Sequence, residues 1–138
     1  MNKPSTIDTG LLIIRIGYGI AFLLHGYPKL AGGPVLWAKL GASMGLLGIH
    51  FAPVFWGFMA SISEFLGACC LILGIAVRPA SAFMLFTMIV ATVLLTSNGQ
   101  GFVQVSHPVE AGVVFLALLV AGPGAYSLCR RCRKCREQ

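Results

Sequence analysis

The chain has 138 residues, of which 57% are hydrophobic and only 10% are charged, and its formal net charge is +6. Its mean hydropathy is +0.87. Because a soluble domain normally carries about 25% charged residues, these values exclude an ordinary water-soluble protein and indicate one that folds in a lipid bilayer.

Four apolar segments approach the roughly 20 residues that a transmembrane helix requires. We predict helices at about 10–30, 53–77, 80–97 and 108–127. The first segment contains Arg15 and His25 and lacks a small-residue cleavage site, so we interpret it as a retained helix and not as a signal peptide. The expected fold is therefore all-α: an integral membrane four-helix bundle, residues 1–128, that forms one domain.

Residues 31–52 separate the first two predicted spans. The sequence Gly32-Gly33-Pro34 breaks the helix, and Trp37, Lys39 and His50 interrupt an otherwise apolar stretch. We expect this part to lie in the membrane interface or to re-enter the bundle.

Shorter links join the remaining spans. Val77-Arg78-Pro79 is typical of a tight helical hairpin, because proline suits the first turn of a new helix. Residues 97–107 form a longer polar link, and Gly122-Pro123-Gly124 breaks or kinks the last helix near its exit.

The distribution of basic residues predicts the orientation of the bundle. With four spans, both termini share a side with Arg78 and with five basic tail residues: Arg130, Arg131, Arg133, Lys134 and Arg136. The opposite side has only Lys29 and Lys39. By the positive-inside rule, we expect a multi-pass protein of the cytoplasmic (inner) membrane with both termini in the cytoplasm.

Two of the four acidic residues, Glu64 and Glu110, fall within apolar spans. A charged side chain at the bilayer centre costs about 3 kcal/mol on insertion scales, so such groups normally face the bundle interior and have partners. The first helix offers basic partners on one face, through side chains spaced three and four residues apart: Arg15, Tyr18, Phe22, His25 and Lys29. Glu64 is expected to pair with Arg15 or His25.

A second polar cluster is expected at the outer end of the bundle. Glu110 follows His107 by three residues on one helical face, at a depth similar to that of Lys29. Asn98 and Gln104 in the adjoining link are further candidates for this cluster.

These charges have a structural and a functional interpretation. In the structural one, they form a satisfied salt-bridge network that fixes the order of the helices. In the functional one, they form a pocket for a small anion or a quinone head group, or a proton path. His25 and Glu64 are then the candidate catalytic, proton-carrying groups, and the candidate pocket residues are Arg15, Tyr18, Lys29, His107 and Glu110.

The five cysteines do not form the framework of a disulfide scaffold. Cys129, Cys132 and Cys135 are candidate redox thiols in the basic tail at residues 129–138, where neighbouring cations favour thiolates. Zinc normally takes four ligands, so no metal site is predicted. The alternative is a basic anchor on anionic lipid, with incidental or acylated thiols. Cys69 and Cys70 are interpreted as packing residues.

Nearly the whole chain resembles the DoxX family of membrane proteins. The matching residues lie in each predicted span: Arg15, Gly19, Phe22, His25, Gly26, Lys29 and Leu30; Glu64, Gly67, Gly74 and Arg78; Met88 and Ala91; Glu110, Gly122, Pro123, Gly124, Tyr126, Ser127 and Leu128. The resemblance implies a four-helix membrane fold and redox chemistry, since relatives include subunits of thiosulfate:quinone oxidoreductase and proteins linked to oxidative stress. The family often has aspartate after Tyr-Ser-Leu, where this chain has Cys129.

The leading hypothesis is a membrane-embedded, quinone-linked oxidoreductase or redox accessory subunit, with sulfur or oxidative-stress metabolism as its context. No dinucleotide fingerprint, complete haem-attachment motif or phosphate loop occurs in the sequence, so no covalent cofactor is predicted and a redox partner protein is expected. A small transporter and an assembly subunit of a membrane complex are the alternatives. The lipid bilayer is the expected partner, nucleic acid is not one, and homo-oligomers are left open.

Overall fold

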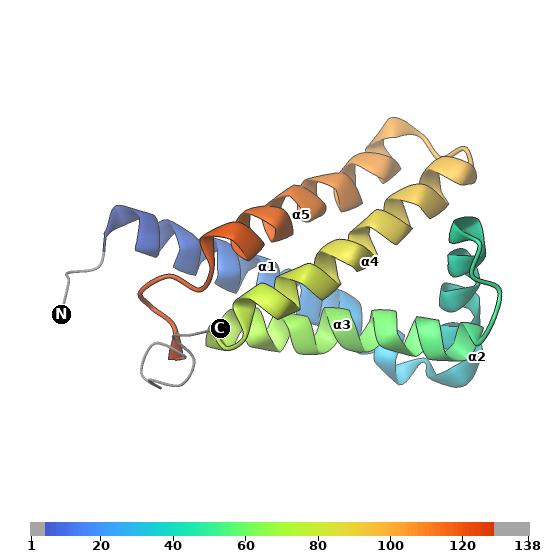
Figure 1. Ribbon diagram of the computed structural model, residues 1–138, viewed down its shortest axis with the longest axis horizontal. Helices are drawn as coiled ribbons and strands as arrows, with labels where there is room; N and C mark the ends of the chain where they lie inside the picture. The colour runs from blue at the N-terminus through green and yellow to red at the C-terminus, as the bar shows by residue number, and fades with distance from the viewer. Residues whose placement is uncertain (1–4, 129–138) are drawn as a thin grey trace.

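The computed structural model describes residues 5–128 (Figure 1). Its elements in chain order are α1 Thr6–Ala31, α2 Gly33–Gly41, the 3-10 helix η1 Ala42–Leu47, α3 Pro53–Leu73, α4 Val77–Ser97 and α5 Phe102–Ala121. Over the described range the secondary structure is entirely helical. Four of these helices, α1, α3, α4 and α5, are long and apolar enough to cross a membrane. The predicted all-α membrane bundle is confirmed.

The ends of the helices differ from the expected ones. The last helix begins at Phe102, six residues before Pro108, so this proline lies inside the helix, where it removes one backbone hydrogen bond. It ends at Ala121, since Gly122 adopts a φ of 78°. The third span begins at Val77, directly after a turn in which Gly74 and Ala76 both have positive φ.

The long helices form an antiparallel bundle. α1 and α3 run side by side, the chain turns back into α4 after residues 74–76, and α5 returns along α4 (Figure 1). The segment after α5 meets the start of α1, where the backbone N–H of Ala125 donates to Asp8 Oδ1 at 2.6 Å. Both ends of the described chain therefore lie at one end of the bundle.

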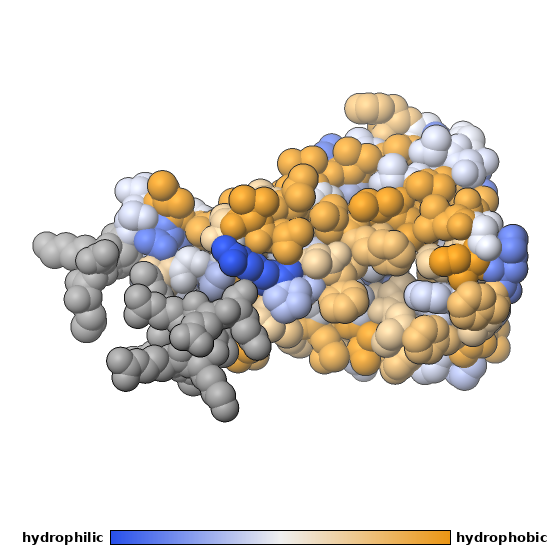
Figure 2. Space-filling view, in the orientation of Figure 1, coloured by the Kyte–Doolittle hydropathy of each residue, from blue (hydrophilic) through white to orange (hydrophobic). Residues whose placement is uncertain are grey.

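The core joins all four spans through large side chains. Phe22 of α1 contacts Phe115 of α5 with ring centroids 4.9 Å apart, and Leu71 of α3 and Met84 of α4 are fully buried beside them. The outward-facing surface is also apolar, and Figure 2 shows hydrophobic side chains over most of the visible face. Such a surface fits lipid as its solvent.

Glycines bring the helix backbones close together. A Cβ at Gly26 of α1 would lie 2.8 Å from the backbone nitrogen of Phe65 in α3. At Gly57 of α3 a Cβ would overlap the carbonyl group of Trp37 in α2, and at Gly41 of α2 it would overlap that of Pro53. Small residues at such points are what close helix packing in a membrane requires.

The segment between α1 and α3 folds onto the bundle. α2 packs against the N-terminal half of α3, where the Trp37 ring contacts Phe58 with centroids 4.9 Å apart. η1 then crosses from α2 toward the C-terminal end of α4 (Figure 1), and its Met44 is buried. The expected interfacial or re-entrant segment is thus a helical wall at the end of the bundle opposite Asp8.

Candidate functional site

A cavity of about 610 Å³ lies between α3 and α4. Residues spaced three and four apart line it on α3: Trp56, Ala60, Ser63, Gly67 and Cys70. A matching row lines it on α4: Ala80, Phe83, Thr87, Ala91 and Leu94. Each row is one helical face, so the cavity follows the two helices for most of their length.

The divergence of α3 and α4 creates this cavity. The two helices are close near the turn at residues 74–76, where a Cβ at Gly67 would meet the side chain of Met84. They separate toward the other end (Figure 1). There Ser43 and Met44 of η1 complete the wall of the cavity. The sequence reading did not predict a cavity at this position.

The mouth of the cavity is surrounded by lipid-facing side chains. Phe55, Phe83 and Phe86 line the cavity and are exposed on the outside of the bundle, with Phe83 67% exposed. A ligand would therefore enter from the bilayer and would be largely apolar.

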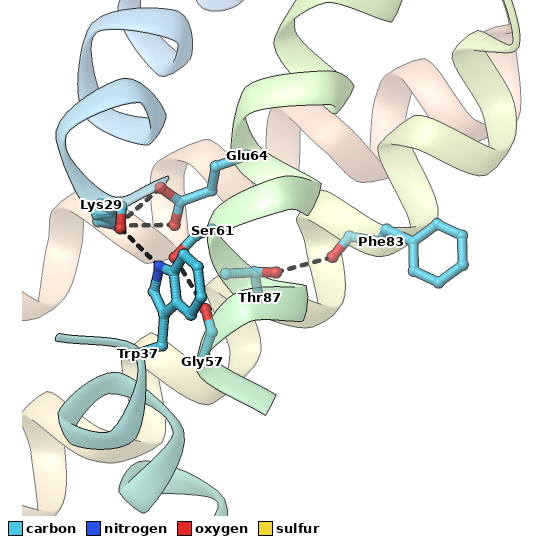
Figure 3. A network of polar contacts seen from close by, with 7 residues as sticks. All are labelled: Lys29, Trp37, Gly57, Ser61, Glu64, Phe83 and Thr87. Carbon is cyan, nitrogen blue, oxygen red and sulfur yellow. Dashed lines mark hydrogen bonds and ion pairs between the residues drawn. The ribbon is translucent and has the colours of Figure 1, made fainter. Parts of the chain in front are cut away.

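One ion pair lies at the wall of the cavity. Lys29 Nζ of α1 contacts both carboxylate oxygens of Glu64 on α3, at 2.8 and 2.7 Å (Figure 3). The Glu64 side chain is 2% exposed and that of Lys29 is 36% exposed. The Trp37 indole Nε1 donates to the Lys29 carbonyl at 3.0 Å and so joins α2 to the end of α1.

The expected pairing of Glu64 with Arg15 or His25 is wrong. Arg15 lies fourteen residues before Lys29, about 21 Å away along the helix, and therefore at a different depth. His25 is at a suitable depth but on another face, because its neighbour Gly26 is the residue that faces α3.

Arg15 instead binds backbone carbonyls at the other end of the bundle. It is 1% exposed, and its Nε donates to the Leu71 carbonyl at 2.9 Å. Its terminal nitrogens donate to the carbonyls of Pro123 and Tyr126. The guanidinium thus joins α1, the last turns of α3 and the segment after α5, and it does not line the cavity.

The remaining predicted residues face the α1–α5 side. The His25 and His107 rings have centroids 6.1 Å apart, and Tyr18 contacts Phe115 at 6.0 Å. His25, His107 and Glu110 are exposed, and none of the three lines the cavity. Within residues 5–128, Lys29 pairs with Glu64, and no hydrogen bond or ion pair joins it to His107 or Glu110 as the expected outer cluster required.

The pattern of charged residues does not predict the neutral polar residues of the cavity. Trp56, Ser63 and Thr87 line it, and the seven-residue spacing of Trp56 and Ser63 on one helix was the available signal. Cys70 also lines the cavity. The candidate thiols Cys129, Cys132 and Cys135 lie outside the described residues.

Comparisons with known proteins agree with the resemblance. A family model described as DoxX matches residues 10–97. The chain is 31% identical over 148 residues to the inner membrane protein YphA of Escherichia coli K12, covering 95% of this chain and 100% of YphA. It is 28% identical to the inner membrane protein YqjF of the same organism, covering 92% of this chain and 95% of YqjF. No solved structure matches.

Proposed function

Because this chain belongs to the DoxX family of membrane proteins, we propose that it is a quinone-linked oxidoreductase, or the membrane subunit of one, and that quinone binds between α3 and α4. The observation that carries this proposal is the cavity. It is apolar, it opens among lipid-facing phenylalanines, and an ion pair lies at its wall.

The size and lining of the cavity fit a quinone. Pockets for small molecules usually enclose about 300–1,000 Å³ and combine apolar walls with a few polar groups. A quinone has an apolar ring and chain, carries polar oxygens only at its head, and dissolves in lipid. Phe83 and Phe86 would contact the hydrocarbon tail of the quinone where this tail leaves the cavity.

The chemistry assigned to the site is the transfer of two electrons and two protons, which converts a quinone to a quinol. A redox partner protein supplies the electrons. The Lys29 ammonium, held by the Glu64 carboxylate, lines the cavity and is positioned to hold protons beside the quinone oxygens. We place this role at Lys29 and Glu64 and not at His25, which lies on the α1–α5 side.

Glu64→Gln is expected to weaken quinone binding by about 10-fold or more, because the neutral amide no longer holds the Lys29 ammonium through charge-assisted hydrogen bonds. The measurement is equilibrium binding of a short-chain quinone to the purified protein in nanodiscs, with empty nanodiscs subtracted. Glu110→Gln is the matched control, since Glu110 is exposed on α5 and distant from the cavity lining.

If Glu64→Gln binds quinone as tightly as the wild type, the Lys29–Glu64 ion pair does not belong to the quinone site. Copurification of quinone and of a partner protein with the wild type would support the proposal. Protein-dependent proton or anion flux in liposomes without an electron donor would instead favour the transporter alternative.

The proposed location is the inner membrane, with both termini in the cytoplasm. The contact between Ala125 and Asp8 brings the two ends of the described chain to one side. A fluorescent protein fused to the C-terminus should therefore fluoresce in bacteria, and alkaline phosphatase fused there should be inactive. Phosphatase inserted at Gly99, in the link between α4 and α5, should be active. The opposite pattern would mean that both termini face the periplasm.

A further inference from the structure

Two polar atoms of the cavity residues have no partner within the described part of the chain. Trp56 Nε1 and Ser63 Oγ are both buried, and neither forms a hydrogen bond there. Both residues line the cavity on the same face of α3. Buried polar groups in proteins are nearly always hydrogen-bonded. We therefore expect a bound molecule to supply the hydrogen-bond partners of these two atoms.

Several similar groups nearby form hydrogen bonds within the described chain. Ser61 Oγ donates to the Gly57 carbonyl at 2.8 Å, and Thr87 Oγ1 donates to the Phe83 carbonyl at 3.1 Å (Figure 3). The other indole of the chain, at Trp37, donates to Lys29. Ser81 Oγ and Ser127 Oγ are also buried without a partner in the described residues, but Trp56 and Ser63 are the two of this group that line the cavity.

The spacing of the two residues indicates the shape of the ligand. They are seven residues apart, which is two helical turns and about 10.5 Å along α3. This distance of about 10.5 Å separates their Cα atoms, so a ligand that accepts hydrogen bonds from both side chains needs acceptor oxygens at two opposite ends. A para-quinone carries its two carbonyl oxygens at opposite ends of its ring.

We propose that Trp56 and Ser63 bind the two opposite carbonyl oxygens of a para-quinone whose ring lies along α3. This inference rests on the proposed function and adds the ring-binding groups to it. An indole N–H only donates, so the ligand atom next to Trp56 must be an acceptor. The ring is then held from both ends, and its substituents lie against the apolar α4 face.

The test uses the full chain in nanodiscs with duroquinone, whose ring is fully methylated and so resists addition of the Cys70 thiol. Ser63→Ala and Trp56→Phe should each raise the dissociation constant about 3- to 10-fold, because each removes one hydrogen bond. Ser61→Ala and Ser106→Ala are the controls, since neither residue lines the cavity and each hydroxyl donates to a backbone carbonyl of its own helix, and they should leave it unchanged.

A second measurement guards against effects on folding. The ratio of affinities for duroquinone and tetramethylphenol, which has the same methylated ring but one oxygen, does not depend on how much protein is folded. This ratio should fall in Ser63→Ala and Trp56→Phe but not in the controls.

The outcomes separate the two proposals. If the wild type shows no saturable duroquinone binding, the proposed function fails and this inference fails with it. If the wild type binds but Ser63→Ala and Trp56→Phe keep both its affinity and its ratio, the inference is overturned while the quinone site stands.

Discussion

Replacing Gly57 with valine should destabilise the protein by about 3 kcal/mol or more, because the new side chain cannot fit between α3 and α2. Even the first added carbon would overlap the backbone carbonyl of Trp37, which can move only if α2 moves as a whole. The free energy of unfolding, measured by titration with SDS in mixed micelles, checks this expectation.

Gly17→Ala in α1 is the matched control. A Cβ at Gly17 meets no atom within 4 Å, so this change should leave stability unaltered or raise it by up to about 1 kcal/mol through helix propensity. Equal losses in Gly57→Val and Gly17→Ala would contradict the close approach of α2 and α3.

Arg15→Gln should lower the free energy of unfolding by about 3 kcal/mol. The buried guanidinium donates to three backbone carbonyls, which would lose their strongest donor. The same SDS titration measures this loss. Lysine should restore little of it, because a single ammonium cannot reproduce the planar fork that reaches α3 and the segment after α5.

Arg78→Gln provides the comparison at the same end of the bundle. Arg78 is exposed and makes one long hydrogen bond of 3.4 Å, to the Val120 carbonyl. Its replacement should change stability by less than about 0.5 kcal/mol. A loss as large as that of Arg15→Gln would mean that any cation at this end is equivalent, which contradicts the role of burial.

Hydrophobic length and the rarity of charge predicted the four spans and the membrane setting, and both are confirmed. They follow from the chemistry of each segment alone. The DoxX resemblance, which rested on particular residues in each span, is confirmed as well. The last helix was predicted to begin at Pro108, but a proline can also lie inside a helix, and this helix begins at Phe102.

The partners of the charged residues were not predictable from one sequence. Spacing on the first helix indicated one face with Arg15, Tyr18, Phe22, His25 and Lys29. Arg15 and Phe22 are buried, but Gly19 and Gly26 complete the buried face of α1 in place of Tyr18 and His25. Glycines select that face because they let α3 approach, and a pattern of polar side chains does not contain this information.

The cavity between α3 and α4 was not predictable from the sequence for a related reason. It depends on the angle at which α3 and α4 separate after residues 74–76 and on the position of η1, and both are properties of the assembled bundle. Trp56 and Ser63 are uncharged, so the pattern of ionisable residues does not indicate them.

The Lys29–Glu64 pair also bears on how the chain enters the membrane. Lys29 is 35 positions ahead of Glu64, so during synthesis α1 is inserted before the carboxylate of α3 arrives. An unpaired charge at this depth would cost about 3 kcal/mol, and the waiting ammonium offsets much of that cost. We therefore expect the side chain that we place beside quinone also to favour the docking of α3 onto α1 during insertion.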